Sequence, residues 1–340
     1  LEKGRGKLGA FVGAMKAAGL EDAVEKNRLS ARRAYGAALL ALGKADRRIV
    51  DVDGDVSNST FTIFFAKEFK DRFAECKIAE QNMVSVAAGL AAGGMIPFAS
   101  SFGKFLARAF DQVEMATISR APIKMVGSHT GVTLAADGPS QMGLTDMAFF
   151  GSFSTADNGK GSPACIVLHP SDAVSAYRLT ELAANLDTMC YVRTHRPDVP
   201  LLYGQDEQFQ VGGSKVLAQG DAVTVVSSGA MVHYARQAVE QLAAEGVKCT
   251  LIDAYCLPLD GRPILAAAAR TGGRIVTVED NYGGGIGSAV AEIVATSGNN
   301  AKVRMMTCRR IPKSGNTPED VLKLVGLDVP SIVSTIRSML

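Results

Sequence analysis

One carboxylate in the sequence stands where it could exchange a proton with a bound ligand. Glu80 follows the apolar pair Ile78-Ala79 and precedes a run from Met83 to Ala91 that is typical of a helix. Acidic residues are common in the first turn of a helix because they interact favourably with its dipole, so spacing alone favours an ordinary helix start. Ile78 and Met83 would also favour the protonated carboxyl group by desolvation, which suits a proton-exchanging role.

Aromatic and imidazole side chains follow Glu80. Phe102 and Phe105 have the spacing of one helix face, which usually lies in a core but could also form the wall for a flat ring. His129 precedes a glycine and the turn at Asp137-Gly-Pro. A single histidine is more often structural than functional, so His129 is a candidate only in combination with its neighbours.

Two arginines are candidates for binding an anion. The planar fork of arginine matches phosphate oxygens, and a hydroxyl such as that of Ser59 could add a hydrogen bond. Arg193 ends a predicted strand, where open α/β sheets present ligand groups. Arg32 alone would be an ordinary exposed charge on a helix.

These residues lie on alternating strands and helices. Strands are predicted at 49–53, 95–100, 122–127, 164–169, 189–193, 222–227, 248–253, 274–279 and 302–308. This alternation predicts an α/β fold with mainly parallel sheets covered on both faces, that is, two three-layer α/β/α domains. We expect an N-terminal lead-in over residues 1–29, a first domain over 30–195, a linker over 196–208 and a second domain over 209–340.

Composition excludes several classes of protein. The chain has 340 residues, 47% apolar and 21% charged, which suits a packed protein of two domains. Its net charge of +2 gives no general attraction for nucleic acid, and no apolar run is long enough for a membrane span. The six cysteines have no spacing typical of a metal site, so we expect no metal ligands, free thiols and a cytoplasmic protein without a signal peptide.

Several motifs in one order resemble the transketolase family, over residues 32–340. They are Ile78-Ala-Glu-Gln-Asn-Met-Val84, Phe98-Ala-Ser-Ser-Phe102, Gly127-Ser-His-Thr-Gly131, Asp137-Gly-Pro-Ser-Gln141, Val278-Glu-Asp-Asn-Tyr282 and Arg310-Ile-Pro-Lys-Ser-Gly315. The resemblance implies the thiamine-diphosphate-binding fold, with a pyrimidine-binding domain followed by the family's C-terminal domain. It implies transfer of a two-carbon ketol unit from a ketose phosphate to an aldose phosphate, as in the pentose phosphate pathway.

The resemblance also implies a role for each candidate residue. Glu80 would bond the pyrimidine ring of thiamine diphosphate and activate the cofactor, which carries the carbanion chemistry. Phe105 would pack on that ring with Phe102 nearby, and Gln141 would bond near the cofactor and the substrate carbonyl. The implied substrate contacts are those of Arg32, Ser59, His129, Asp137 and Arg193.

The family's upstream domain has no counterpart in this chain. That domain holds the diphosphate and Mg²⁺ (or Ca²⁺) through a Gly-Asp-Gly motif, and no such motif occurs here. We therefore expect one subunit of a split transketolase, with an N-terminal diphosphate-binding subunit as its partner and an α2β2 assembly. The Ala/Gly-rich run 87–94 would permit the close helix contact that such an interface needs.

Three other interpretations remain open. A β-type subunit of a 2-oxo acid dehydrogenase, or a deoxyxylulose-phosphate synthase-like enzyme, would share the fold and the role of Glu80. A non-catalytic partner subunit would need none of the site residues. Gly283-Gly-Gly-Ile-Gly287 opens a predicted helix, but it lacks the spacing of a nucleotide-binding motif, so we interpret it as structural.

Overall fold

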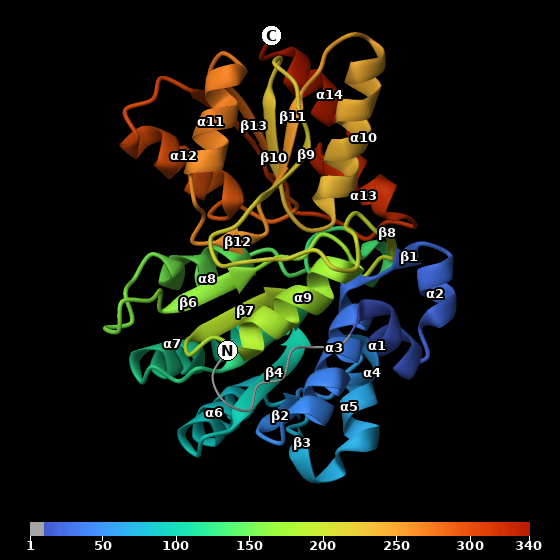
Figure 1. The fold of residues 1–340 in the computed structure, drawn as a ribbon, viewed down its shortest axis with the longest axis vertical. Helices are drawn as coiled ribbons and strands as arrows, with labels where there is room; N and C mark the ends of the chain where they lie inside the picture. The colour runs from blue at the N-terminus through green and yellow to red at the C-terminus, as the bar shows by residue number, and fades with distance from the viewer. Residues whose placement is uncertain (1–9) are drawn as a thin grey trace.

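The computed structural model describes residues 10–340, which form two α/β units stacked along the long axis of the molecule (Figure 1). Residues 1–9 of the predicted lead-in lie outside the described part of the chain. Each unit has a central sheet between two layers of helices, so the predicted fold class is confirmed. Within residues 10–340 no helix combines the length and the apolar character needed to cross a membrane.

The first unit contains a seven-stranded sheet in the order β12-β6-β7-β5-β4-β2-β3. Every neighbouring pair is parallel except β12 with β6. The strands in chain order are β2 (Ile49–Asp53), β3 (Phe73–Glu75), β4 (Ile96–Phe102), β5 (Lys124–Ser128), β6 (Cys165–Leu168), β7 (Met189–Arg193) and β12 (Cys256–Leu257).

Side chains alternate between the two faces of this sheet and bury a different helix layer on each. One face packs against α1 (Phe11–Ala17), α3 (Ala31–Ala45) and α9 (Ala173–Ala184). The other packs against α6 (Glu80–Ala92) and α8 (Asp146–Ser154). The remaining helices of this unit are α2 (Glu21–Glu25), α4 (Ser57–Thr60), α5 (Ile63–Glu68), η1 (Lys70–Arg72), η2 (Phe105–Ala109), α7 (Phe110–Ile118) and η3 (Ala135–Asp137).

The second unit is built on a five-stranded sheet in the order β14-β13-β10-β11-β9. Only β9 runs antiparallel to its neighbour. Its strands are β9 (Lys215–Ala218), β10 (Thr224–Ser227), β11 (Thr250–Asp253), β13 (Arg274–Val278) and β14 (Lys302–Met306). Its helices are α10 (Met231–Ala244), α11 (Arg262–Arg270), α12 (Ile286–Thr296), α13 (Pro318–Val325) and α14 (Val329–Arg337).

The chain segments before and between the two units are folded onto them. Phe11 of the predicted lead-in is buried and packs edge-on against Tyr177 of α9, with ring centroids 5.7 Å apart. β1 (Arg28–Leu29) pairs with β8 (Val199–Pro200) of the predicted linker. Residues 11–29 are therefore part of the packed first unit, and β12, from the region predicted as the second domain, completes the first sheet.

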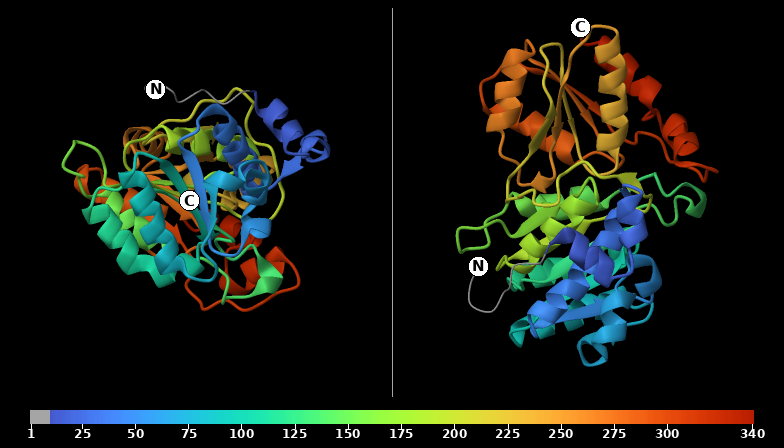
Figure 2. Two further views of the ribbon diagram at one scale, coloured as in Figure 1. Left: turned by 90° about the horizontal axis from the view of Figure 1, so that it is seen from below. Right: turned by 45° about the vertical axis from the view of Figure 1, so that its right-hand side comes forward.

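The loops that leave the carboxyl ends of both sheets meet between the units. His169 follows β6, and its Nδ1 lies 2.9 Å from the hydroxyl of Ser228, which follows β10. Asp280 follows β13 and forms an ion pair with Arg193, the last residue of β7. The edge where ligand groups are expected in a parallel sheet is thus bounded by the second unit (Figure 2).

Candidate active site

Glu80 is the first residue of α6 and is 2% exposed. The helix packs against β4 through an apolar side that includes Met83, and this packing holds Glu80 at the carboxyl edge of the first sheet. Ile78 is 71% exposed and does not shield the carboxylate, so that part of the prediction is wrong. Instead Glu80 Oε1 accepts a hydrogen bond of 2.6 Å from Nη1 of Arg108.

A row of stacked rings begins beside this ion pair. The guanidinium carbon of Arg108 lies 5.1 Å from the centre of the Phe105 ring. Phe105 stacks on Phe102 with centroids 4.8 Å apart, and Phe102 stacks on His129 at 3.8 Å. The structure therefore brings three of the predicted cofactor-binding residues and the predicted substrate histidine into one continuous row.

His129 follows β5 with a φ of 55°, a left-handed conformation that places its ring against Phe102. Its Nδ1 lies 3.0 Å from the Ser128 hydroxyl, and the residue is 3% exposed. Burial, followed by the positive charges of Arg32 and Arg196, lowers the pKa of His129 to about 3. The imidazole is therefore neutral near pH 7, where it can exchange hydrogen bonds with hydroxyl groups without carrying charge.

A cationic cleft of about 510 Å³ is lined in part by Arg32, Arg33 and Arg196, and two of these, Arg32 and Arg196, are the arginines whose charges act on His129. Burial, and then repulsion from Arg196, lowers the pKa of Arg32 to about 10, so Arg32 remains charged near pH 7. Arg33 is paired with Asp198 at 3.3 Å. This leaves an excess of positive charge that suits an anion.

The predicted residues Ser59 and Asp137 contact two of the three arginines of this cleft, Arg32 and Arg196. The carbonyl oxygen of Ser59 accepts a hydrogen bond of 2.9 Å from Arg32 Nη1. Asp137 Oδ2 lies 3.5 Å from Arg196 Nε. Gln141 is half-buried on the same turn as Asp137, and its backbone N–H donates to the Gly138 carbonyl at 3.1 Å.

Arg193, unlike Arg32, does not line the cleft. It is fully buried, and its guanidinium donates to Asp146 Oδ2 at 2.8 Å and to Asp280 Oδ1 at 3.1 Å. Burial lowers the pKa of Arg193, but these two carboxylates outweigh that effect and hold the pKa above its usual value. Arg196, three residues further along the chain, lines the cleft instead.

The second unit also contributes to the cleft, which the sequence analysis missed. Asn316 and Pro318 line it. Gly315 N–H donates to the Ala135 carbonyl at 3.4 Å, and a Cβ at Gly138 would lie 2.5 Å from the Ser314 hydroxyl oxygen. The match of Arg310–Gly315 to the family motif was the available signal, because that segment packs directly on the Asp137 turn.

The glycine-rich start of α12 is accounted for within the chain. The N–H groups of Ile286 and Gly287, at the start of α12, donate to the Glu279 carboxylate at 2.8 and 2.9 Å. An internal carboxylate thus occupies the donors that a nucleotide phosphate would need, in agreement with the structural interpretation of the glycine run. Within residues 10–340 no cluster of three His, Cys, Asp or Glu side chains is arranged to hold a metal ion.

Comparison with known proteins places both units in one family. Residues 27–200 match the model of the transketolase pyrimidine-binding domain, and residues 212–332 match that of the transketolase C-terminal domain. Human transketolase is 43% identical over 319 residues, which cover 92% of this chain and 49% of the human protein. The chain therefore spans about half the length of the curated relatives it matches.

Solved structures show the same arrangement. A split-gene transketolase, described as an inactive β4 tetramer, superimposes with a TM-score of 0.80 and 33% identity, covering 92% of this chain and 98% of the other. The transketolase from Leishmania mexicana superimposes with a TM-score of 0.76 at 20% identity, covering 92% of this chain and 45% of that one. The second likeness bears on the fold alone.

Proposed function

Because this chain belongs to the transketolase family, we propose that it forms one half of a ketol transferase dependent on thiamine diphosphate. The assembly would move a two-carbon ketol unit from a ketose phosphate to an aldose phosphate. The observation that supports this proposal most strongly is the pairing of a buried Glu80 with a planar group that lies over the Phe105 ring.

The contacts of Arg108 test whether the residues present fit the cofactor. The resemblance assigns to the aminopyrimidine ring a hydrogen bond with Glu80 and stacking on Phe105. The guanidinium of Arg108 is also planar; it donates a hydrogen bond to Glu80, and its central carbon lies over the Phe105 ring. The surroundings of Glu80 therefore fit a flat, hydrogen-bonding ring, and Arg108 has to release Glu80 when such a ring enters.

Within this chain the chemical task falls on Glu80. When bound, thiamine diphosphate supplies the carbanion chemistry of the reaction. Glu80 would hold and return a proton at the pyrimidine ring, and the apolar face of α6 would keep water from its carboxyl group. Phe102 and Phe105 would fix the plane of the ring, and His129 would bond a hydroxyl group of the substrate as a neutral imidazole.

The cationic cleft suits the phosphate group of the sugar. We assign Arg32 and Arg196 as its charged ligands, in place of Arg32 and Arg193, because only the former pair lines the cleft. Thr133 also lines the cleft, and its buried hydroxyl oxygen has no partner within residues 10–340, so it has a free hydrogen bond for a ligand. Asp137 would accept a hydrogen bond from a sugar hydroxyl.

The diphosphate and Mg²⁺ would be held by a separate polypeptide. A split-gene transketolase is known, and the chain spans about half of its curated relatives. We propose an α2β2 assembly in which this chain carries Glu80 and the partner carries the Gly-Asp-Gly motif. All six cysteines are free and buried, and we propose a cytoplasmic location because reduced thiols persist there.

The cleft also separates this proposal from its alternatives. A subunit of a 2-oxo acid dehydrogenase has no need for paired arginines beside the substrate, and a non-catalytic partner has no need for Glu80. The test is to co-express the chain with a diphosphate-binding half and to measure ketol transfer from xylulose 5-phosphate to ribose 5-phosphate. Transfer that requires both halves, thiamine diphosphate and Mg²⁺ supports the proposal, whereas oxidative decarboxylation without transfer overturns it.

A further inference from the structure

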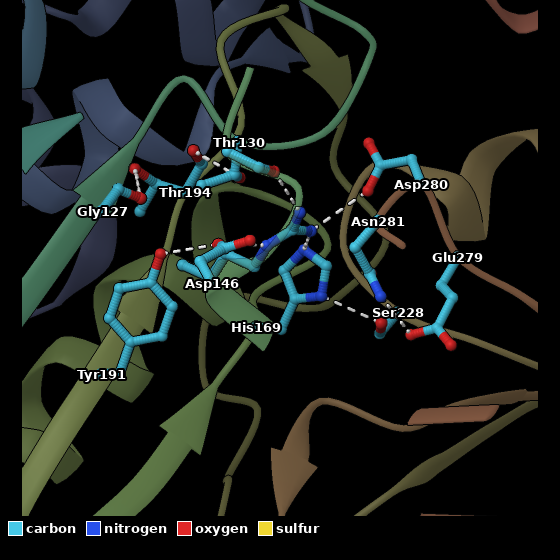
Figure 3. Close-up of polar contacts among 12 residues, drawn as sticks. Gly127, Thr130, Asp146, His169, Tyr191, Thr194, Ser228, Glu279, Asp280 and Asn281 are labelled. Atoms are coloured by element: carbon cyan, nitrogen blue, oxygen red, sulfur yellow. Dashed lines mark hydrogen bonds and ion pairs between the residues drawn. The ribbon is translucent and has the colours of Figure 1, made fainter. Parts of the chain in front are cut away.

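Arg193 connects the two units through a fully buried set of contacts. Besides its bonds to Asp146 and Asp280, its Nη1 lies 3.0 Å from His169 Nε2, and its Nη2 donates to the Gly143 carbonyl at 3.0 Å. Arginine can only donate, so His169 Nε2 accepts and the Nδ1 proton of His169 points to Ser228. Figure 3 shows Asp146, His169 and Asp280 converging from different parts of the fold.

Gly143 links this set of contacts to the candidate active site. Its carbonyl oxygen also accepts a hydrogen bond of 2.9 Å from Gly131 N–H, and its own N–H donates to the His129 carbonyl at 3.3 Å. Gly143 therefore joins the two ends of the loop that carries His129, Asp137 and Gln141. Because Arg193 holds Gly143, it fixes the backbone next to the left-handed His129.

Asp280 of the second unit contacts the same loop from the other side. A Cβ at Gly131 would lie 1.7 Å from Asp280 Oδ2, so the carboxylate packs directly against the backbone of Gly131, whose φ is +73°. The other carboxylate oxygen of Asp280 accepts from Arg193 Nη1 at 3.1 Å. Asp280 thus touches the loop directly and holds the arginine that supports it.

We propose that Asp280, through Arg193 and Gly143, is a positioning residue for His129 and Asp137. The proposal rests on the proposed function and deepens it, because it gives the second unit a role in substrate handling. The reacting group must be held within a fraction of an ångström, so a loop anchored by the second unit transmits any change there to the substrate.

The neighbouring residue provides a matched control. Glu279 is also a buried carboxylate on the segment after β13, but its hydrogen bonds go to Asn281 and the start of α12 in its own unit, and Arg193 acts on it only through a weaker electrostatic attraction. Figure 3 shows Glu279 and Asp280 on the same segment with their carboxyl groups in different surroundings. Asp280→Asn and Glu279→Gln make the same chemical change at adjacent positions, so they separate positioning of the loop from general loss of stability.

The first measurement needs no activity. Hydrogen–deuterium exchange of the full chain is compared for the wild type, Asp280→Asn, Asp280→Ala and Glu279→Gln. The proposal expects faster exchange in residues 129–143 for both Asp280 variants, more so for alanine, and wild-type exchange there for Glu279→Gln. Equal exchange in this loop for all four proteins would overturn it.

The second measurement uses the reconstituted pair with xylulose 5-phosphate and ribose 5-phosphate. We expect kcat/KM for the donor to fall about tenfold to a hundredfold in Asp280→Ala. Asp280→Asn, which keeps an acceptor oxygen, should recover part of that loss, while thiamine diphosphate affinity stays unchanged. A loss in Glu279→Gln as large as that in the Asp280 variants would contradict the proposal, whereas absence of transfer in the wild-type pair would count against the proposed function only.

Discussion

Nη1 of Arg108 lies 2.6 Å from Oε1 of Glu80, and 28 residues of sequence separate the two. The arginine side chain is 55% exposed, whereas that of Glu80 is 1% exposed. A buried carboxylate is thus paired with a side chain that can leave toward solvent. Under the proposed function, this asymmetry would let Glu80 exchange an internal partner for the cofactor.

Removing the guanidinium should strengthen cofactor binding. In Arg108→Met the ion pair with Glu80 is absent and does not have to be broken. The assembly of the two halves should therefore require about threefold to tenfold less thiamine diphosphate for half-saturation. The estimate takes about 0.7–1.4 kcal/mol in total for the ion pair and the cation–π contact, because the arginine that makes both is half exposed. Arg47→Met, at the exposed amino end of β2, is the control and should leave half-saturation unchanged. Weaker binding in Arg108→Met would show that the arginine assists the cofactor instead.

Loss of Arg196 should weaken binding of the phosphorylated donor specifically. Arg196→Ala should raise KM for xylulose 5-phosphate about tenfold, because a charge-assisted hydrogen bond is lost, and should change the reaction of unphosphorylated xylulose little. The ratio of kcat/KM for the two donors measures the effect. If the ratio is the same in wild type and Arg196→Ala, Arg196 does not bind phosphate.

Arg193→Ala should lower stability as well as loosen the loop that carries His129. The substitution leaves the buried carboxylates of Asp146 and Asp280 without their cation, which should lower the free energy of unfolding by about 3–5 kcal/mol. Chemical denaturation of the full chain measures this loss. A change below about 1 kcal/mol would mean that the buried pairs contribute little to the join between the units.

A buried histidine should make the protein sensitive to acid. Both ring nitrogens of His195 lack hydrogen-bond partners within residues 10–340. Burial, followed by His233, Arg193 and Arg32, lowers the pKa of His195 to about 3. The unfolded chain binds this proton near pH 6.5 and the folded chain does not, so the stability due to neutral His195 is complete above pH 6.5 and falls toward pH 3.

The matching variant is His195→Phe, which has a flat ring and no titration. Between pH 6 and pH 4 the wild type should lose about 1.4 kcal/mol per pH unit relative to the variant. The difference between two chains cancels the opposing effect of buried carboxyl groups such as Asp253, whose pKa burial raises to about 7. A difference in stability that does not change with pH would show that native His195 takes up its proton over the same pH range as His195 in the unfolded chain.

The central strands of the fold could be predicted from local sequence. β2 and β7 are short, mostly apolar stretches flanked by polar or glycine-containing sequence, and their observed limits equal the predicted ones. β12 could not be predicted, because two residues gain their strand character only by pairing with β6. The start of α13 was predictable from the capping box formed by Thr317 and Asp320, with proline in the first turn.

The sequence motifs predicted which side chains gather near Glu80, but not the contacts that depend on packing. Glu80 opens its helix as expected, and Phe102, Phe105 and His129 come together as their motifs implied. Arg193 and Arg196 lie in one short segment. Only the structure shows that Arg193, at the end of β7, points toward the contact between the two units. Arg108 gave no local signal, because its contact with Glu80 depends on how η2 packs against α6.

The most direct test of the account is the turnover of Glu80→Gln in the reconstituted pair. The amide keeps the size of the side chain but cannot exchange a proton, so ketol transfer should fall by about 10²–10⁴. Assembly with the diphosphate-binding half, measured on the same samples, should be unchanged. Turnover equal to that of the wild type would contradict a catalytic role for Glu80 and would make this chain a non-catalytic partner.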